Sequence, residues 1–146
     1  MDYMHFAIEY LKSHNANPAE IPVCAIIVKD GEILALAQNQ KEEKNDVTSH
    51  AEIEAIKIAQ QKLKSWRLDG CEMYVTLEPC PMCAWAVIQS RIKTVYFGSF
   101  DMNYGALGSK LDLRQLSNSK LNVYGGILQN ECDEILKSYF SAIRLK

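Results

Sequence analysis

A short, continuous apolar run at residues 23–28 (Val-Cys-Ala-Ile-Ile-Val) sets the tightest limit on the architecture of this chain. The run has the length of a β-strand, and a strand that is apolar at every position is typical of a sheet covered on both faces. A turn at residues 29–32, with Asp30-Gly31 at its centre, and a second apolar segment at 33–37 follow directly. This order predicts a β-hairpin in a sheet that lies between two layers of helices.

Helical and strand-like segments alternate along the rest of the chain. Apolar residues recur at helical spacing in three segments, at 3–13, 51–63 and 81–90. The same spacing follows Asn130, which we expect to cap the last helix. Strand patterns follow at 72–77, 94–97 and 121–124. The segments 38–49 and 98–118 are predicted to be irregular. Five strands and the intervening helices predict an α/β protein, with one mixed five-stranded sheet and helices on both faces.

Composition places the chain among ordinary globular proteins. Its 146 residues are about one domain's worth, and 48% are hydrophobic and 23% charged. No apolar run approaches the ~18–20 residues of a membrane helix, and the net charge of −2 predicts no broad attraction for nucleic acid. Five cysteines, an odd number, and an amino terminus without a signal-peptide pattern favour reduced thiols and a cytoplasmic location.

The chemically informative residues fall in two short segments, His50-Ala51-Glu52 and residues 79–83 (Pro-Cys-Pro-Met-Cys). Cys80 and Cys83 are three positions apart at the start of a predicted helix, so both sulfurs lie on one face near the positive end of its dipole. One imidazole and two thiolates form a ligand set suited to zinc, and three protein ligands leave a position for water, as in catalytic sites. We therefore expect Zn²⁺ at His50, Cys80 and Cys83.

Two other interpretations of this cluster stay open. A structural zinc site needs a fourth protein ligand, and no candidate stands at a short ligand spacing from the cluster. The candidates are Cys24, Cys71, Cys132, His5 and His14. The remaining interpretation is that the cluster holds no metal.

The position of Glu52 favours the catalytic interpretation. On the predicted helix it lies on the apolar face, in line with Ala55, Ile56, Ala59 and Leu63. The polar residues of the helix are expected on the opposite side: Glu54, Lys57 and Gln61. A buried carboxyl group is costly without a partner, and beside zinc-activated water it would act as a general acid/base. A carboxyl satisfied by backbone groups is the alternative. Because His50 and Glu52 are about 200° apart on a regular helix, both address one metal only if His50 is at the helix edge.

Three motifs in this order resemble the cytidine/deoxycytidylate deaminase superfamily, and within it they are most similar to bacterial tRNA-specific adenosine deaminases. They are His50-Ala51-Glu52, residues 77–84 (Leu-Glu-Pro-Cys-Pro-Met-Cys-Ala) and residues 97–101 (Phe-Gly-Ser-Phe-Asp). The resemblance implies the three-layer α/β/α fold of cytidine deaminases and a single zinc-dependent deaminase domain over residues 1–146.

The same resemblance implies hydrolytic deamination of adenosine to inosine at the wobble position of tRNA, with the anticodon loop as substrate. His50, Cys80 and Cys83 would hold the zinc that activates water, and Glu52 would carry protons. Asn39 matches a pocket asparagine that would contact the base or its ribose, with a loop-forming role as the alternative. Asp101 matches an aspartate near the RNA backbone, with turn formation as the alternative.

A symmetric homodimer is also implied, and the apolar helix at 81–90 favours it. Two other functions remain: a free nucleobase or nucleoside deaminase, for example a guanine deaminase, and a non-catalytic zinc-containing binding subunit. The presence of Glu52 argues against the binding subunit, which needs no proton shuttle. The chain departs from the family pattern at Trp85, where a small residue is usual, and at Glu42 and Glu43, which would repel RNA phosphates.

Overall fold

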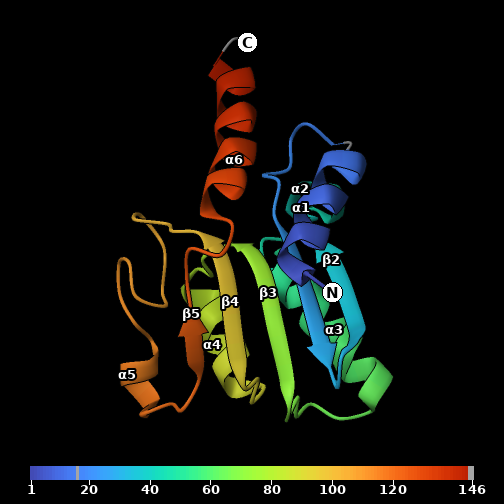
Figure 1. The fold of residues 1–146 in the computed structure, drawn as a ribbon, viewed down its shortest axis with the longest axis vertical. Helices are drawn as coiled ribbons and strands as arrows, with labels where there is room; N and C mark the ends of the chain where they lie inside the picture. The colour runs from blue at the N-terminus through green and yellow to red at the C-terminus, as the bar shows by residue number, and fades with distance from the viewer. Residues whose placement is uncertain (16, 145–146) are drawn as a thin grey trace.

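Five strands form one mixed sheet in the order β2-β1-β3-β4-β5 (Figure 1). The computed structural model describes residues 1–15 and 17–144. The strands are β1 (Cys24–Lys29), β2 (Glu32–Gln38), β3 (Cys71–Leu77), β4 (Thr94–Ser99) and β5 (Asn122–Tyr124). β1 pairs antiparallel with β2 and with β3, whereas β3 with β4 and β4 with β5 are parallel. The predicted hairpin and mixed five-stranded sheet are confirmed.

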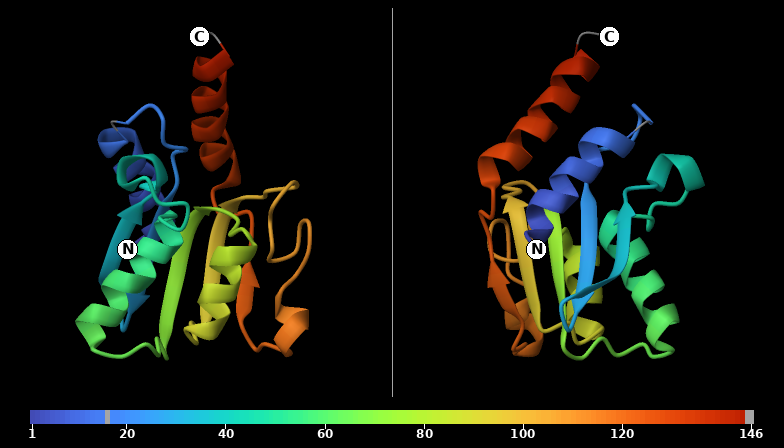
Figure 2. Two further views of the ribbon diagram at one scale, coloured as in Figure 1. Left: turned by 180° about the vertical axis from the view of Figure 1, so that it is seen from behind. Right: turned by 45° about the vertical axis from the view of Figure 1, so that its right-hand side comes forward.

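Helices cover both faces of this sheet, so the predicted three-layer architecture is also confirmed (Figure 2). The helices are α1 (Tyr3–His14), α2 (Lys41–Lys44), α3 (Ala51–Leu63), α4 (Pro81–Gln89), α5 (Arg114–Ser117) and α6 (Gln129–Arg144). α3 and α4 pack on one face, and α1 and the first part of α6 pack on the other. Within the described part of the chain, no helix combines the length and apolar character needed to cross a bilayer.

Side chains of β1 alternate between the two cores, which explains why its first five residues are all apolar. Ala25 and Ile27 belong to the core beneath α3 and α4. Cys24, Ile26 and Val28 belong to the core beneath α1. All five are buried, as expected for a strand that contacts helices on both faces. The cysteine therefore fills space as a small apolar residue, and burial raises its pKa to about 12.

The short helix α2 lies within the segment that the sequence predicts to be a loop. Its first backbone N–H groups, those of Glu42 and Glu43, donate to the carboxylate of Glu20 at 2.9–3.1 Å. Glu20 is 4% exposed and lies more than twenty residues earlier in the chain. A single turn of helix fixed by so distant a group leaves no periodic pattern in its own sequence.

Two further differences concern the carboxyl-terminal part of the chain. The segment predicted to be irregular at 98–118 contains the single-turn helix α5, and α6 begins at Gln129, so Asn130 lies in its first turn instead of at its cap. Near its start, α6 packs closely on β4, since a methyl group at Gly98 would lie 2.3 Å from the sulfur of Cys132. Farther along, Phe140 and Ile143 are 43% and 46% exposed, and the helix projects beyond the sheet (Figure 1).

Candidate metal and substrate site

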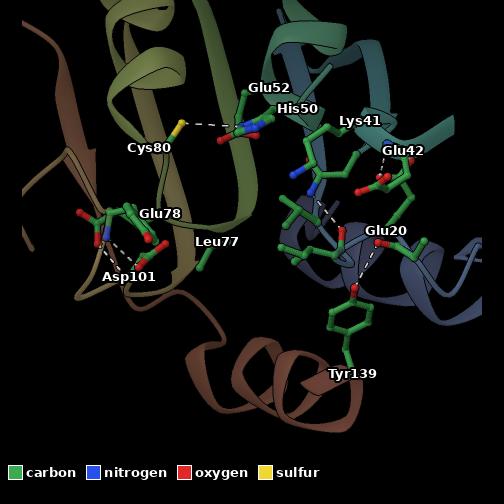
Figure 3. A pocket seen from close by; sticks show the side chains of 15 residues that line it. Glu20, Lys41, Glu42, His50, Glu52, Leu77, Glu78, Cys80, Asp101 and Tyr139 are labelled. Carbon is green, nitrogen blue, oxygen red and sulfur yellow. Dashed lines mark hydrogen bonds between the residues drawn. The ribbon is translucent and has the colours of Figure 1, made fainter. Parts of the chain in front are cut away.

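A cavity of about 470 Å³ opens where β3 ends and where α3 and α4 begin (Figure 3). Its lining includes four of the sequence-predicted site residues with charged or metal-binding side chains: His50, Glu52, Cys80 and Asp101. Asn39, at the end of β2, also lines it. The structure therefore brings residues from four separate segments to one cavity, as expected for a ligand site at the carboxyl end of parallel strands.

His50, Cys80 and Cys83 form one potential metal-binding group, with their donor atoms all within 4.8 Å of one another. The His50 Nδ1 atom lies 3.6 Å from the sulfur of Cys80 and 3.5 Å from that of Cys83. Tetrahedral zinc with bonds of about 2.0–2.1 Å to nitrogen and about 2.3 Å to sulfur places such donor atoms about 3.6 Å apart. The donor set and its spacing thus fit zinc. Among residues 1–15 and 17–144, no fourth histidine, cysteine or carboxylate joins this group.

The histidine reaches the cysteines because it precedes α3 instead of lying within it. His50 occupies the N-cap position with an extended backbone (φ −72°, ψ 154°), so the condition that it stand at the helix edge is met. Asn39 fixes this junction: its side-chain oxygen accepts from the Ala51 N–H at 2.9 Å, and its amide donates to the Ile21 carbonyl at 3.0 Å. Asn39 therefore has a structural role whatever its part in substrate binding.

The two cysteines lie at the start of α4, as predicted. Cys80 is the N-cap residue, Pro81 follows at the first helical position, and Cys83 is buried in the first turn. Hydrogen bonds from Cys83 and from His50 lower the pKa of Cys80 to about 4, whereas the bond to Cys80 and burial raise the pKa of Cys83. The same contact with Cys80 raises the pKa of His50. At neutral pH the group therefore presents a thiolate, the form that binds metal.

Glu52 is buried in the first turn of α3, with 4% of its surface exposed, and it lines the cavity beside the cluster. Ala55 and Ala59, on the same face of the helix, are fully buried, so the predicted orientation of Glu52 is confirmed. Burial, together with the nearby Cys80 thiolate, raises the pKa of Glu52 to about 7. A carboxyl group with this pKa can both accept and release a proton near neutrality.

Glu54 lies on the side of α3 opposite Glu52, as predicted, but it is buried. It is 7% exposed and contacts Lys44 at the end of α2. The Lys44 ammonium group donates to its carboxylate at 2.8 Å, and Lys57 lies 3.9 Å away. Although burial alone would raise the pKa of Glu54, the bond to Lys44 holds it below its ordinary value. A charged partner thus permits burial of a carboxylate on the polar side of the helix.

Asp101 forms a turn and lines the cavity at the same time. One carboxylate oxygen, Oδ1, accepts from the backbone N–H groups of Asn103 and Tyr104 at 3.1 and 3.0 Å, and its carbonyl accepts from Gly105 at 2.8 Å. The alternative of turn formation is therefore confirmed. The turn brings the 68% exposed ring of Tyr104 to the wall of the cavity.

Sequence reasoning gave no role to two buried carboxylates of the cavity wall, Glu20 and Glu78. Tyr139 of α6 also lines the cavity, and its hydroxyl group donates to the Ala19 carbonyl at 3.2 Å. Glu20 carries no local signal, because the N–H groups that it binds lie more than twenty residues later in the chain. Glu78 belongs to the motif at residues 77–84 that contains Cys80 and Cys83. Its place in this motif could have marked it as a candidate site residue.

Most of the apolar side chains of helix α4 are covered within the chain itself. Ala84, Val87 and Ile88 are buried within the chain itself, and Trp85 is half-buried against the same core. The large residue at Trp85 is thus accommodated within one subunit. Homodimer formation remains a prediction that rests on the resemblance.

Comparison with known proteins identifies the family. The model of the MafB19-like deaminase family matches residues 2–144, and the chain belongs to this family of deaminases. It is 41% identical over 146 residues to a tRNA-specific adenosine deaminase of Bacillus subtilis (strain 168), covering 99% of this chain and 90% of that protein. The resemblance found in the sequence motifs is thereby confirmed.

Solved structures support the same relationship. One, from studies of A-to-I editing by tRNA:A34 deaminases at the wobble position of transfer RNA, superposes with a TM-score of 0.82 at 38% identity and covers 92% of this chain and 98% of its own. A guanine deaminase from Nitrosomonas europaea has a TM-score of 0.80 at 24% identity, covering 94% of this chain and 82% of its own. The second likeness concerns the fold alone, and both confirm the cytidine-deaminase-like architecture.

Proposed function

We propose that this chain is a zinc-dependent hydrolase that converts adenosine to inosine at the wobble position of tRNA. One observation carries the proposal: His50, Cys80 and Cys83 converge beside the buried carboxyl of Glu52 in a cavity. The chain is also 41% identical, over nearly its whole length, to a tRNA-specific adenosine deaminase.

His50, Cys80 and Cys83 are the proposed zinc ligands. Through Nδ1 the histidine contributes a neutral donor, and the two thiolates balance the charge of a divalent ion, which favours a partly buried site. Zinc held there supplies Lewis-acid activation of water near neutral pH. The positive ends of α3 and α4, which both begin at this group, stabilise the thiolates further.

Glu52 is the proposed general acid/base. The overall reaction adds water at C6 of adenine and releases ammonia, so a proton must leave the attacking water and reach the departing amine. Glu52 accepts the first proton and delivers it to the amine nitrogen. A pKa of about 7 suits both steps, because neither proton transfer is then strongly uphill at neutral pH.

Asn39 and Asp101 are the proposed substrate contacts. Among the residues that the structure describes, Asn39 bonds through its carbonyl oxygen and one amide N–H, which leaves its second N–H for a base or ribose oxygen. Within the described residues, Asp101 engages only Oδ1, so Oδ2 is available to accept from a ribose hydroxyl or a base N–H. Both contacts are consistent with the structural roles that these side chains already have.

The proposed substrate is the anticodon loop, because unpaired loops present bases that can be turned into a pocket. We further propose a single deaminase domain over residues 1–146, a symmetric homodimer and a cytoplasmic location. One continuous sheet with a core on each face supports the single domain. The dimer is proposed from the resemblance in the sequence motifs, and the location from the reduced thiols that the cysteine count favours.

Ammonia release tests the function directly. We expect turnover of an anticodon stem-loop with adenosine at the wobble position, and none when inosine replaces that adenosine. Guanine, adenosine and cytidine serve as competing substrates, since a free-base deaminase is the alternative activity. Faster release from guanine than from the stem-loop would assign the alternative, and no release from any substrate would favour a binding subunit.

A further inference from the structure

Glu78 is a buried carboxylate that the proposed mechanism does not use. It is 2% exposed, follows directly after β3, and stands two residues before Cys80. Its carboxylate nevertheless accepts four hydrogen bonds, from the backbone N–H groups of Asp101 (3.1 Å), Leu107 (3.2 Å) and Ser109 (3.1 Å) and from the Ser109 hydroxyl. Such charge-assisted bonds fully satisfy the buried group.

All four donors belong to one segment, residues 101–109, which folds around Glu78. The Ala106 N–H donates to the carbonyl of Pro79 at 2.9 Å, so the segment is bonded to the backbone next to Glu78 as well. The fit is close at Gly105, where an added Cβ would lie 2.4 Å from the carboxyl carbon of Glu78. One side chain therefore anchors this segment at three backbone N–H groups.

This segment is also one wall of the cavity. Asp101 and Tyr104 lie on it and line the cavity. Figure 3 shows Glu78 and Asp101 together on one side, with Lys41 and Glu42 on the other and His50 and Glu52 between them. Glu78 thus connects the wall that faces the substrate to the chain segment that carries Cys80.

We propose that Glu78 is a positioning residue of the deamination site, which holds residues 101–109 in the conformation that aligns the substrate with Glu52. It acts through Asp101 and Tyr104 and takes no part in proton transfer. The inference rests on the proposed function, because the substrate that the wall orients is the one deaminated. It further predicts that loss of the anchor weakens substrate binding more than it slows the chemical step.

The substitution Glu78→Gln tests this role with little change in volume. The glutamine amide presents N–H groups toward two of the four donors, so at least one backbone N–H loses its acceptor. We expect KM for the stem-loop to rise about tenfold, which equals about 1.4 kcal/mol and the loss of about one hydrogen bond to a charged group. kcat should stay within about threefold, and zinc content should not change.

Hydrogen exchange provides a readout that is independent of activity. The substitution should speed exchange either at the Asp101 amide, which donates to Oε1, or at the Leu107 and Ser109 amides, which donate to Oε2, according to which of these positions the glutamine NH2 group takes. Amides of β3 should not exchange faster. Glu72→Gln is the matched control, because Glu72 lies on β3, accepts a hydrogen bond from the Tyr96 hydroxyl at 3.2 Å and is remote from the cavity lining. This control should leave both KM and the exchange of residues 101–109 unchanged.

The possible outcomes distinguish a failure of the positioning role of Glu78 from a failure of the proposed function. Faster exchange with an unchanged KM, unchanged exchange, or a fall in kcat alone would each overturn the positioning role. If the wild type deaminates a free base but not RNA, the proposed substrate is wrong, and the same KM change is then expected for that base. If Glu78→Gln does not fold, Ser109→Ala removes only the hydroxyl bond, and a KM rise of less than about twofold would refute the proposal.

Discussion

Replacing Glu52 by glutamine should abolish turnover and, in metal-free protein, stabilise the fold. Glutamine preserves the shape of the side chain and can still hydrogen-bond, but it cannot carry a proton. Positioned acid–base catalysis is worth about 10²–10⁴-fold, and because one residue is proposed to serve both proton transfers we expect a loss of about 10⁴-fold in kcat. KM and zinc content should change little.

The effect on stability has the opposite sign. Burial raises the pKa of Glu52 from its ordinary value of 4.5 to about 7. Between these pH values the unfolded chain has lost the proton while the folded chain retains it, so the stability of the folded state falls as pH rises. Above pH 7 the deficit amounts to about 3 kcal/mol, since one pKa unit corresponds to about 1.4 kcal/mol. Glu52→Gln removes this deficit.

The assay combines three measurements on the same preparation: inosine formation, zinc by atomic emission, and urea denaturation of chelator-treated protein at pH 5 and pH 8. The variant should exceed the wild type in stability by less than about 1 kcal/mol at pH 5 and by about 3 kcal/mol at pH 8. Turnover within about tenfold of the wild type would refute the proton-transfer role. A variant that is less stable than the wild type at pH 8 would show that the carboxylate is satisfied by its surroundings, as in the structural alternative.

Three further predictions concern the metal, the assembly and the buried ion pair. The chain should bind about one zinc ion, and Cys80→Ser should lose both the metal and turnover, measured by metal analysis; full zinc occupancy in that variant would contradict the ligand assignment. The chain should sediment as a dimer, and a monomer at high micromolar concentration would count against the family-based expectation. Glu54→Gln should destabilise the fold by about 1 kcal/mol at pH 7, because Lys44 loses its partner. Since that partner holds the pKa of Glu54 below 4.5, the difference should shrink as pH falls below this value in urea denaturation, and a penalty that stays constant would argue against the ion pair.

The sequence predicted those parts of the fold that depend on local periodicity and on burial. The continuous apolar strand, the hairpin turn and the helix Ala51–Leu63 all appear as expected. The ligand group was also predictable, because His50, Cys80 and Cys83 have a spacing and chemistry with few other uses. Glu52 was recognisable because a carboxyl on an apolar helical face needs an explanation.

The parts that could not be predicted depend on partners distant in sequence. Helix α2 forms because the carboxylate of Glu20 accepts hydrogen bonds from N–H groups in its first turn. Glu54 can be buried because the ammonium group of Lys44 pairs with its carboxylate. Neither contact changes the local pattern of polar and apolar residues. The same applies to Glu78, whose donors come from a segment more than twenty residues later. Buried polar networks of this kind are built by tertiary contacts, which periodicity does not encode.

Because Asn39 has a structural role, an asparagine at the same position in a related protein does not by itself identify that protein's substrate. The side chain of Asn39, at the end of β2, hydrogen-bonds to the first N–H of α3 and to the Ile21 carbonyl. These two bonds fix the backbone at the start of α3, where His50 is the N-cap residue. Any lineage that kept the metal while changing its substrate would still be under selection to keep this amide. An asparagine at this position therefore indicates how the histidine is held, whether or not its second N–H also contacts the substrate.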